Sequence, residues 1–300
     1  MPLIVRTCSP SQPFPSTRLT NPYRPQAVGQ LTSTSNLLHN LSQCQTLVTK
    51  AVAAGAKALF LPEATDYIAH SPSESLSLVQ PVTTSPFVLG LQAAARRARL
   101  AIHVGVHEPG ASPSKVRNTA LWINDRGEIE QRYQKVHLFD VDIPAGSGSA
   151  AGGVVLTESD SVEPGTAILP PFSTPVGRVG SMICFDLRFP EISLRLSRLG
   201  ADILTYPSAF TIPTGQAHWE VLLRARAIET QSYVVAAAQV GRHNEKRVSY
   251  GHSMVVDPWG TVVAELGGGE DGGEPEIGVV EVDLGVVGRV RGGMKLVRRA

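Results

Sequence analysis

Two apolar runs on either side of an amphipathic stretch constrain the fold of this chain most strongly. The runs occupy residues 27–31 and 57–61, and the second is followed by a proline and then by Glu63. Between them, apolar side chains recur at helical spacing over residues 37–52, and the hydroxyls of residues 32–35 are expected to cap that helix. This order predicts a β-α-β unit. It places Glu63 at the C-terminal end of a buried strand, the edge of an α/β sheet where functional groups collect.

The remaining sequence continues the alternation of strands and helices. Further strands are predicted at residues 100–106, 116–123, 128–133, 172–175, 179–183, 201–206, 232–240, 250–256, 261–265 and 278–282, and further helices at residues 85–98, 191–199 and 216–231. Glycine-rich segments at residues 144–153 and 267–276 predict surface loops. Because neither a repeat nor a linker interrupts this order, we expect one α/β domain over residues 26–290, preceded by an extension at 1–25 and followed by a tail at 291–300.

Charge and composition exclude several classes of protein. The net charge of the 300-residue chain is only +1, so no basic face is concentrated enough for nucleic-acid binding. No apolar run approaches the roughly 18–20 residues of a membrane-spanning helix, so no membrane partner is expected. The three cysteines, Cys8, Cys44 and Cys184, are odd in number and far apart, which argues against a disulfide framework or a clustered metal site. We therefore expect a protein of the cytoplasm, a reducing compartment, with no metal and with Cys44 in its core.

The first 25 residues differ in composition from the rest of the chain. They contain three arginines, several serines and threonines and six prolines, and the first acidic residue of the chain is Glu63. A lack of acids together with arginine and serine is typical of a mitochondrial transit peptide, whereas the prolines oppose the amphipathic helix that such a peptide forms. A disordered extension is the first interpretation, and a mitochondrial targeting segment is the alternative.

A cysteine stands where a strand gives way to a helix. The apolar residues 180–183 lead into Cys184, an aromatic residue and then Asp186 follow, and Pro190 can start the next helix. A thiol at such an elbow can attack a carboxamide carbon if it has a base, donors for the oxyanion and an acid for the leaving group. The alternative is an inert buried thiol, since cysteine is among the most buried residue types. Asp186 is expected to hold the elbow by hydrogen bonding.

Two residues at strand ends are candidates for the groups that this thiol needs. Glu63 follows the strand at 57–61, and Lys135 follows the strand at 128–133. A carboxylate beside a lysine can take the thiol proton while the lysine holds the oxyanion. Taken singly, each has a common structural explanation, a capping or surface acid for Glu63 and a solvated lysine for Lys135. No histidine lies in an obvious elbow, although sequence position alone does not exclude a histidine base.

Three segments together resemble the nitrilase superfamily of carbon–nitrogen hydrolases. They are residues 60–64 (FLPEA), 133–138 (YQKVHL) and 184–191 (CFDLRFPE), in the order found in that family. The residues that the resemblance assigns to the active site are Glu63 as general base, Lys135 as oxyanion donor, Cys184 as nucleophile, the backbone N–H of Phe185 as second oxyanion donor and Glu158 as second glutamate. It also implies a four-layer α-β-β-α sandwich that works without a cofactor and assembles as a homodimer or higher homo-oligomer.

Three later segments carry a narrower resemblance. Residues 205–210, 218–231 and 250–260 are similar to the branch that contains deaminated glutathione amidase. That branch implies hydrolysis of a small-molecule amide, deaminated glutathione, through a cysteine thioester, with ω-amidase activity on α-ketoglutaramate or α-ketosuccinamate as the alternative. A non-catalytic binding or scaffolding member and nitrile hydrolysis are less favoured. A loop expected at residues 211–216 departs from the pattern and is a candidate for shaping specificity.

Substrate contacts are expected from three side chains: Phe210, Arg188 and His218. Arg188 could bind a substrate carboxylate or pair with Asp186 or Glu191, and both interpretations stay open. His218 is also explained by packing or capping at a helix start.

Overall fold

The computed structural model describes residues 23–143 and 154–297. Its strands are β1 (Tyr23–Gln30), β2 (Ala58–Phe60), β3 (Ala101–Pro109), β4 (Val116–Ile123), β5 (Ile129–Gln134), β6 (Asp140–Ile143), β7 (Val154–Thr157), β8 (Val162–Glu163), β9 (Phe172–Thr174), β10 (Gly177–Ser181), β11 (Ile203–Thr205), β12 (Tyr233–Ala236), β13 (Val240–Arg242), β14 (Val248–Tyr250), β15 (Met254–Val256), β16 (Val262–Glu265) and β17 (Glu276–Asp283). Its α-helices are α1 (Leu37–Ala53), α2 (Pro72–Leu78), α3 (Pro86–Ala98), α4 (Pro190–Arg198), α5 (Ile212–Thr230) and α6 (Leu284–Gly293), and its 3-10 helices are η1 (Glu158–Asp160) and η2 (Cys184–Arg188). The glycine-rich loop predicted at 144–153 and most of the predicted extension, to residue 22, lie outside the described residues.

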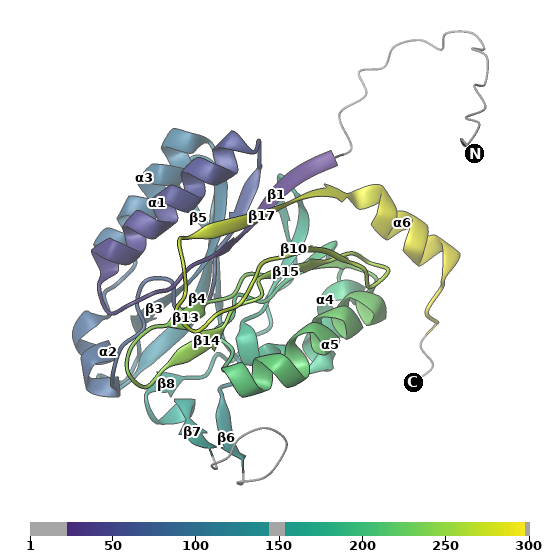
Figure 1. Cartoon of the computed structure of the whole chain (residues 1–300). Helices are drawn as coiled ribbons and strands as arrows, with labels where there is room; N and C mark the ends of the chain where they lie inside the picture. The colour runs from purple at the N-terminus through teal and green to yellow at the C-terminus, as the bar shows by residue number, and fades with distance from the viewer. Residues whose placement is uncertain (1–22, 144–153, 298–300) are drawn as a thin grey trace, which may run out of the picture.

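Two β-sheets lie face to face, with helices on the outer face of each (Figure 1). The strand order is β17-β1-β2-β3-β4-β5 in the first sheet, where β8 pairs with β4, and β16-β15-β12-β11-β10-β9 in the second. The helices α1 and α3 pack on the first sheet, and α4 and α5 pack on the second. This arrangement is the four-layer α-β-β-α sandwich that the sequence resemblance implied.

Three clusters of buried apolar side chains fill the three spaces between the four layers. In β2, Leu59 faces the cluster under α1 and α3, whereas its neighbour Phe60 faces the central cluster between the sheets. In β11, Ile203 belongs to the central cluster and Leu204 to the cluster under α4 and α5. The two-residue period of a strand therefore supplies both faces of each sheet with apolar side chains, which is why the strands read as continuous apolar runs.

The predicted β-α-β unit is present at the start of the described chain. β1 and β2 pair in parallel with α1 between them, and β2 pairs in parallel with β3. The prediction that residues 32–35 cap α1 was wrong, because the N-cap is Asn36, whose side chain accepts the N–H groups of Leu38 and His39. The Thr34 hydroxyl accepts from the Asn36 N–H instead and so fixes the cap itself.

The first and the last strand of the described chain lie side by side in the first sheet. β1 begins at Tyr23, three residues before the expected start of the domain, and pairs antiparallel with β17 over its whole length. The helix α6 follows β17 directly and ends at Gly293, so it includes residues that were expected in the tail (Figure 1). None of the described helices combines the length and the apolar character needed to span a membrane.

The segment expected as a loop at residues 211–216 is a helix, which corrects that prediction. α5 begins at Ile212, and Pro213 lies in its first turn, where a missing N–H costs no intrahelical hydrogen bond. The short helix α2, the β6–β7 hairpin and α6 were also not predicted.

Candidate active site

A tight turn between β10 and α4 carries Cys184. The φ angle of Cys184 is +44°, a left-handed conformation that residues with a Cβ adopt only when their surroundings hold it. The Cys184 N–H donates to the Pro207 carbonyl at 3.0 Å. The buried Asp186 carboxylate accepts from the Ile183 N–H at 3.0 Å and from the Tyr133 hydroxyl at 2.7 Å. The strand–turn–helix elbow predicted from the sequence is therefore present, and Asp186 holds it.

Contacts of Asp186 also tie the elbow to the first sheet. Tyr133 belongs to β5, and His137, just beyond that strand, donates its backbone N–H to Asp186 at 3.0 Å and its Nδ1–H at 2.9 Å. The His137 ring stacks on Phe189 with ring centroids 3.5 Å apart. Because Cys184 follows the second sheet, these bonds set how closely Cys184 approaches residues of the first sheet.

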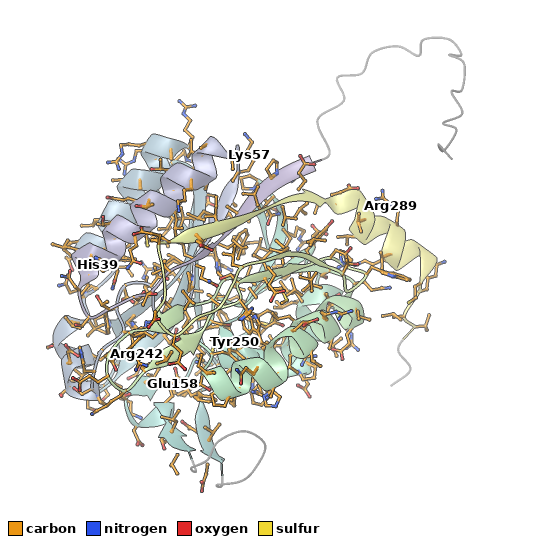
Figure 2. All side chains as sticks on the ribbon, in the orientation of Figure 1. His39, Lys57, Glu158, Arg242, Tyr250 and Arg289 are labelled. Atoms are coloured by element: carbon orange, nitrogen blue, oxygen red, sulfur yellow. The ribbon has the colours of Figure 1, made fainter. Side chains whose placement is uncertain are left out.

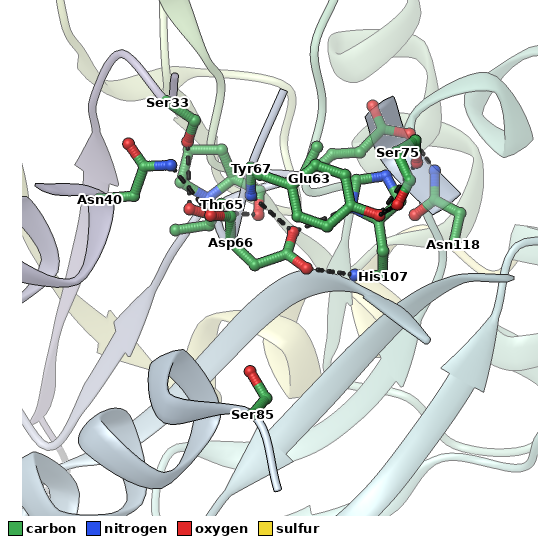
Figure 3. A network of polar contacts seen from close by, with 12 residues as sticks. Ser33, Asn40, Glu63, Thr65, Asp66, Tyr67, Ser75, Ser85, His107 and Asn118 are labelled. Atoms are coloured by element: carbon green, nitrogen blue, oxygen red, sulfur yellow. Dashed lines mark hydrogen bonds and ion pairs between the residues drawn. The ribbon is translucent and has the colours of Figure 1, made fainter. Parts of the chain in front are cut away.

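The loop after β2 presents Glu63 and is held on several sides. The Gln239 side chain donates to the Glu63 carbonyl at 3.0 Å, and Asp66 accepts from the His107 N–H at 2.8 Å and from His107 Nδ1 at 2.9 Å (Figure 3). Gly105 of β3 lies so close that a Cβ there would stand 2.6 Å from the Glu63 Cα. The position of the Glu63 backbone therefore depends on residues far away in the sequence.

Four buried or half-buried polar side chains meet around Lys135. The Lys135 Nζ lies 3.0 Å from Glu63 Oε1 and 2.9 Å from Glu158 Oε2. The Asn118 side-chain amide donates to Glu63 Oε1 at 2.7 Å and to Glu158 Oε1 at 3.3 Å. The Phe139 N–H donates to Glu158 Oε2 at 2.7 Å. Glu158 lies at the end of the sandwich from which the β6–β7 hairpin projects (Figures 1 and 2).

The charges of this cluster shift the pKa values of its members. Burial alone would raise the pKa of Glu63, but the Lys135 charge and hydrogen bonds from Cys184, Lys135 and Asn118 outweigh it and lower that pKa. Burial opposes the charge of Lys135, yet Glu158 and Glu63 raise its pKa well above the usual value. For Cys184, burial and then the Glu63 charge raise the pKa, and Lys135 opposes them only in part. The resting site therefore holds ionised Glu63, charged Lys135 and a neutral thiol.

A small pocket opens onto Cys184. Its lining residues are Phe139, Cys184, Phe185, Arg188, Ala209, Phe210, Thr211 and Thr214. The Arg188 guanidinium lies 6.0 Å from the ring centroids of both Phe185 and Phe210, and it donates to His218 Nδ1 at 2.9 Å. The wall of the pocket is thus aromatic, with one cation at its edge.

The structure brings together most of the residues predicted for the site. Glu63, Lys135, Cys184 and Glu158 form one cluster. Phe185 lies in the first turn of η2, where N–H groups lack a partner within the helix. Phe210 and Arg188 line the pocket, whereas His218 lies behind Arg188 and does not line it. Arg188 forms no ion pair with any residue in the described parts of the chain, so of its two open interpretations the pairing with Asp186 or Glu191 is not observed.

Three residues that position the cluster were missed by the sequence analysis. Asn118 bridges the two glutamates, Gln239 holds the Glu63 backbone, and Gly105 makes room for it. One signal was available for Asn118, because it is a polar residue in a strand, β4, that is otherwise mostly apolar. The other two act through contacts that no local pattern reveals.

The arrangement provides the groups for acyl transfer to a thiol. A buried carboxylate lies next to the thiol, and an ammonium group stands beside both. A carbonyl carbon that enters the pocket would reach the sulfur with positive charge close to its oxygen. No group of His, Cys, Asp and Glu side chains among the described residues is arranged to hold a metal ion.

Comparison with known proteins agrees with this chemistry. A family model described as carbon-nitrogen hydrolase matches residues 27–292. The chain belongs to this family of hydrolases, the nitrilase superfamily. The probable hydrolase nit2 of Schizosaccharomyces pombe is 48% identical over 276 residues, which are 91% of this chain and 96% of that protein. The deaminated glutathione amidase of Homo sapiens is 48% identical over 269 residues, 88% of this chain and 78% of that protein.

A solved structure confirms the nitrilase-type fold. The NitFhit protein of Caenorhabditis elegans, a nitrilase and fragile histidine triad fusion protein, superposes with a TM-score of 0.81 and 41% sequence identity. The match covers 90% of this chain and 63% of the fusion protein. The present chain therefore corresponds to a part of that longer protein.

Proposed function

We propose that this chain is an amidase that hydrolyses the amide bond of deaminated glutathione through a thioester on Cys184. The name of the human relative, 48% identical over most of this chain, supports the substrate, and the carbon–nitrogen hydrolase family supports the reaction class. The observation that carries the proposal is the convergence of Glu63, Lys135 and Cys184 in one buried cluster, from which Cys184 lines the pocket.

Acylation begins when the Cys184 thiol transfers its proton to Glu63 as sulfur attacks the amide carbon. Since the resting pKa of Glu63 is low and that of Cys184 is high, a free thiolate is disfavoured, and proton transfer accompanies the attack. The Lys135 ammonium and the Phe185 N–H hold the oxyanion. Glu63 then gives its proton to the nitrogen, the C–N bond breaks, and the amine leaves a thioester behind.

Deacylation reverses the roles of the same groups. A water molecule attacks the thioester carbon and gives one proton to Glu63, and Lys135 again stabilises the oxyanion. The C–S bond breaks, and the proton on Glu63 returns to the sulfur, so that the acid product and the original thiol are formed. Glu158 keeps Lys135 charged and oriented during both steps, since it lies 2.9 Å from Nζ.

The pocket edge fits an anionic acyl group. Glutathione without its amino group still carries carboxylates, and Arg188 is the cation beside Cys184 that has no carboxylate partner among the described residues. Phe210 supplies an apolar wall, and His218 accepts a hydrogen bond from Arg188 and so orients the guanidinium.

The test is hydrolysis of deaminated glutathione, α-ketoglutaramate, glutamine, butyramide and a simple nitrile, with mass measurement of acid-quenched enzyme. We expect the highest kcat/KM for deaminated glutathione and an acyl adduct on Cys184. Cys184→Ala should abolish both, whereas Cys44→Ala, at a fully buried cysteine in α1, should keep both.

The variant Arg188→Gln tests recognition of the substrate carboxylate separately from hydrolysis of the amide bond. We expect KM for deaminated glutathione to rise about 10- to 100-fold, the value of a charge-assisted hydrogen bond, with little change for butyramide. A large preference of the wild type for α-ketoglutaramate would replace the proposed substrate by that of an ω-amidase. Absence of any adduct and of any hydrolysis would contradict both.

A further inference from the structure

Within residues 23–143 and 154–297, Asn118 is the one neutral side chain that contacts both glutamates of the cluster. Its Nδ2 donates to Glu63 Oε1 at 2.7 Å (Figure 3). The same nitrogen donates to Glu158 Oε1 at 3.3 Å, and the Asn118 backbone carbonyl accepts from the Lys135 N–H at 2.9 Å. The residue is 4% exposed and lies on β4, beside the strand that leads into Lys135. Asn118 therefore contacts three of the four groups proposed for the reaction.

The remaining atom of the amide argues for a role other than packing. Asn118 Oδ1 is buried and finds no hydrogen-bond partner among the described residues. An unsatisfied buried carbonyl destabilises a fold, so an apolar residue of the same shape would suit this strand better if packing were the only requirement. The contacts of Asn118 with the cluster are made by the N–H groups of its side-chain amide, which donate to Glu63 and Glu158.

The positions of the hydrogen-bond donors on Glu63 indicate how the Asn118 amide affects this carboxylate. Asn118 and Lys135 both donate to Oε1. The other carboxylate oxygen, Oε2, receives no donor from these two, so it can accept a proton from the Cys184 thiol, which is close enough to lower the pKa of this carboxyl group. Two donors on one oxygen also fix the rotation of the carboxylate plane, which a single lysine would leave free.

We propose that Asn118 is a positioning residue that keeps Glu63 ionised and turns its second oxygen toward the Cys184 thiol. The inference rests on the proposed function, because it takes Glu63 as the general base. The titratable groups that face Glu63 are Lys135, Glu158 and Cys184. With both glutamates ionised and Lys135 charged, the cluster has a net charge of −1. A neutral donor shared by both carboxylates stabilises this excess charge without neutralising the base.

The test compares Asn118→Ala and Asn118→Leu with Asn124→Ala. Asn124 is a matched control, because its buried Nδ2 also donates to two glutamates, Glu128 at 2.8 Å and Glu130 at 2.7 Å, but at the other end of β4. Loss of the Asn118 donor should move the acid limb of the kcat/KM profile up by about one to two pH units. It should also lower kcat roughly 100-fold through misplacement of the base.

A second measurement makes the result independent of turnover. Titration of ¹³C-labelled glutamate carboxyls by NMR, with Glu63→Gln to assign the signal, should show a higher pKa of Glu63 in both Asn118 variants and no change in Asn124→Ala. If the wild type hydrolyses none of the amides, the proposed function fails while this titration still decides the role of Asn118. An unchanged pKa of Glu63, or loss of folding in both Asn118 variants when Asn124→Ala folds, would overturn the inference.

Discussion

Replacing Lys135 by methionine tests directly how the positive charge in the site affects turnover and stability. The unbranched side chain is kept up to the position of Cε, but the cluster of two carboxylates and one ammonium loses its only positive charge, so its net charge changes from −1 to −2. Loss of one oxyanion donor costs about 2.7–4 kcal/mol, which corresponds to a roughly 100- to 1,000-fold lower kcat. The Lys135→Met variant should therefore bind substrate but turn it over very slowly.

The same substitution has a separate effect on stability. Removing one partner of a buried ion pair costs about 3–5 kcal/mol, and the lower end applies here because the Glu158 side chain is 18% exposed and partly screened. Without Lys135, the like charges of Glu63 and Glu158 and their burial raise the pKa of one carboxyl above its ordinary value near 4.5. A group whose pKa is raised on folding favours the folded state at low pH. The deficit relative to the wild type should therefore be small near pH 5 and grow toward pH 8.

A double variant separates the two effects. Lys135→Met with Glu158→Gln returns the net charge of the cluster to −1, so urea denaturation at pH 8 should show a free energy of unfolding closer to the wild type, while kcat stays low. The measurements are kcat on deaminated glutathione and unfolding curves at pH 5 and pH 8 for all variants. Retention of more than about a tenth of kcat in Lys135→Met, or a stability deficit that does not depend on pH, would refute this reasoning.

Two further predictions follow from the surroundings of the cluster. Gly105→Ala places a Cβ 2.6 Å from the Glu63 Cα and should lower kcat about 100-fold. The control Gly273→Ala has nothing within 4 Å of the new Cβ and should leave kcat unchanged. Equal activity of the two variants would contradict the close approach of Gly105 to Glu63. Since the pKa of the Cys184 thiol is raised, alkylation by iodoacetamide should be slow at pH 7 and accelerate as pH rises, with no adduct on the fully buried Cys44. A fast rate that is constant from pH 6 to pH 9 would indicate a resting thiolate instead.

Features that depend on neighbouring residues in the chain were predicted well. The elbow at Cys184 follows from an apolar strand, a turn and Pro190 at a helix start, and the β-α-β unit follows from two strand-like runs around a helical period. The strands predicted at residues 116–123 and 128–133 are β4 and β5, which pair antiparallel. Each of these signals lies in one continuous segment of the sequence, so no tertiary contact is needed to read it.

Features that depend on tertiary contacts were missed or misplaced. The segment at 211–216 contains Thr, Pro and Gly and looks like a loop, yet it forms the first turn of α5, where Gly215 packs against the ring of Tyr250. The approach of Gly105 to Glu63 depends on the register between β2 and β3. Asn118 was predicted only as part of a strand and not as part of the site, because its partners Glu63 and Glu158 lie 55 and 40 residues away along the chain.

The site depends on the contact between the two sheets as much as on any of its residues. Glu63, Asn118 and Lys135 all extend from strands of the first sheet, whereas Cys184 extends from the second. The Tyr133–Asp186 hydrogen bond crosses from β5 to the elbow at 2.7 Å and is buried, so it helps to fix the distance between Glu63 and Cys184. Each sheet alone would carry either a base with its lysine or a strained cysteine. Because only their packing brings the thiol to the carboxylate, the catalytic arrangement can form only when the sandwich is complete.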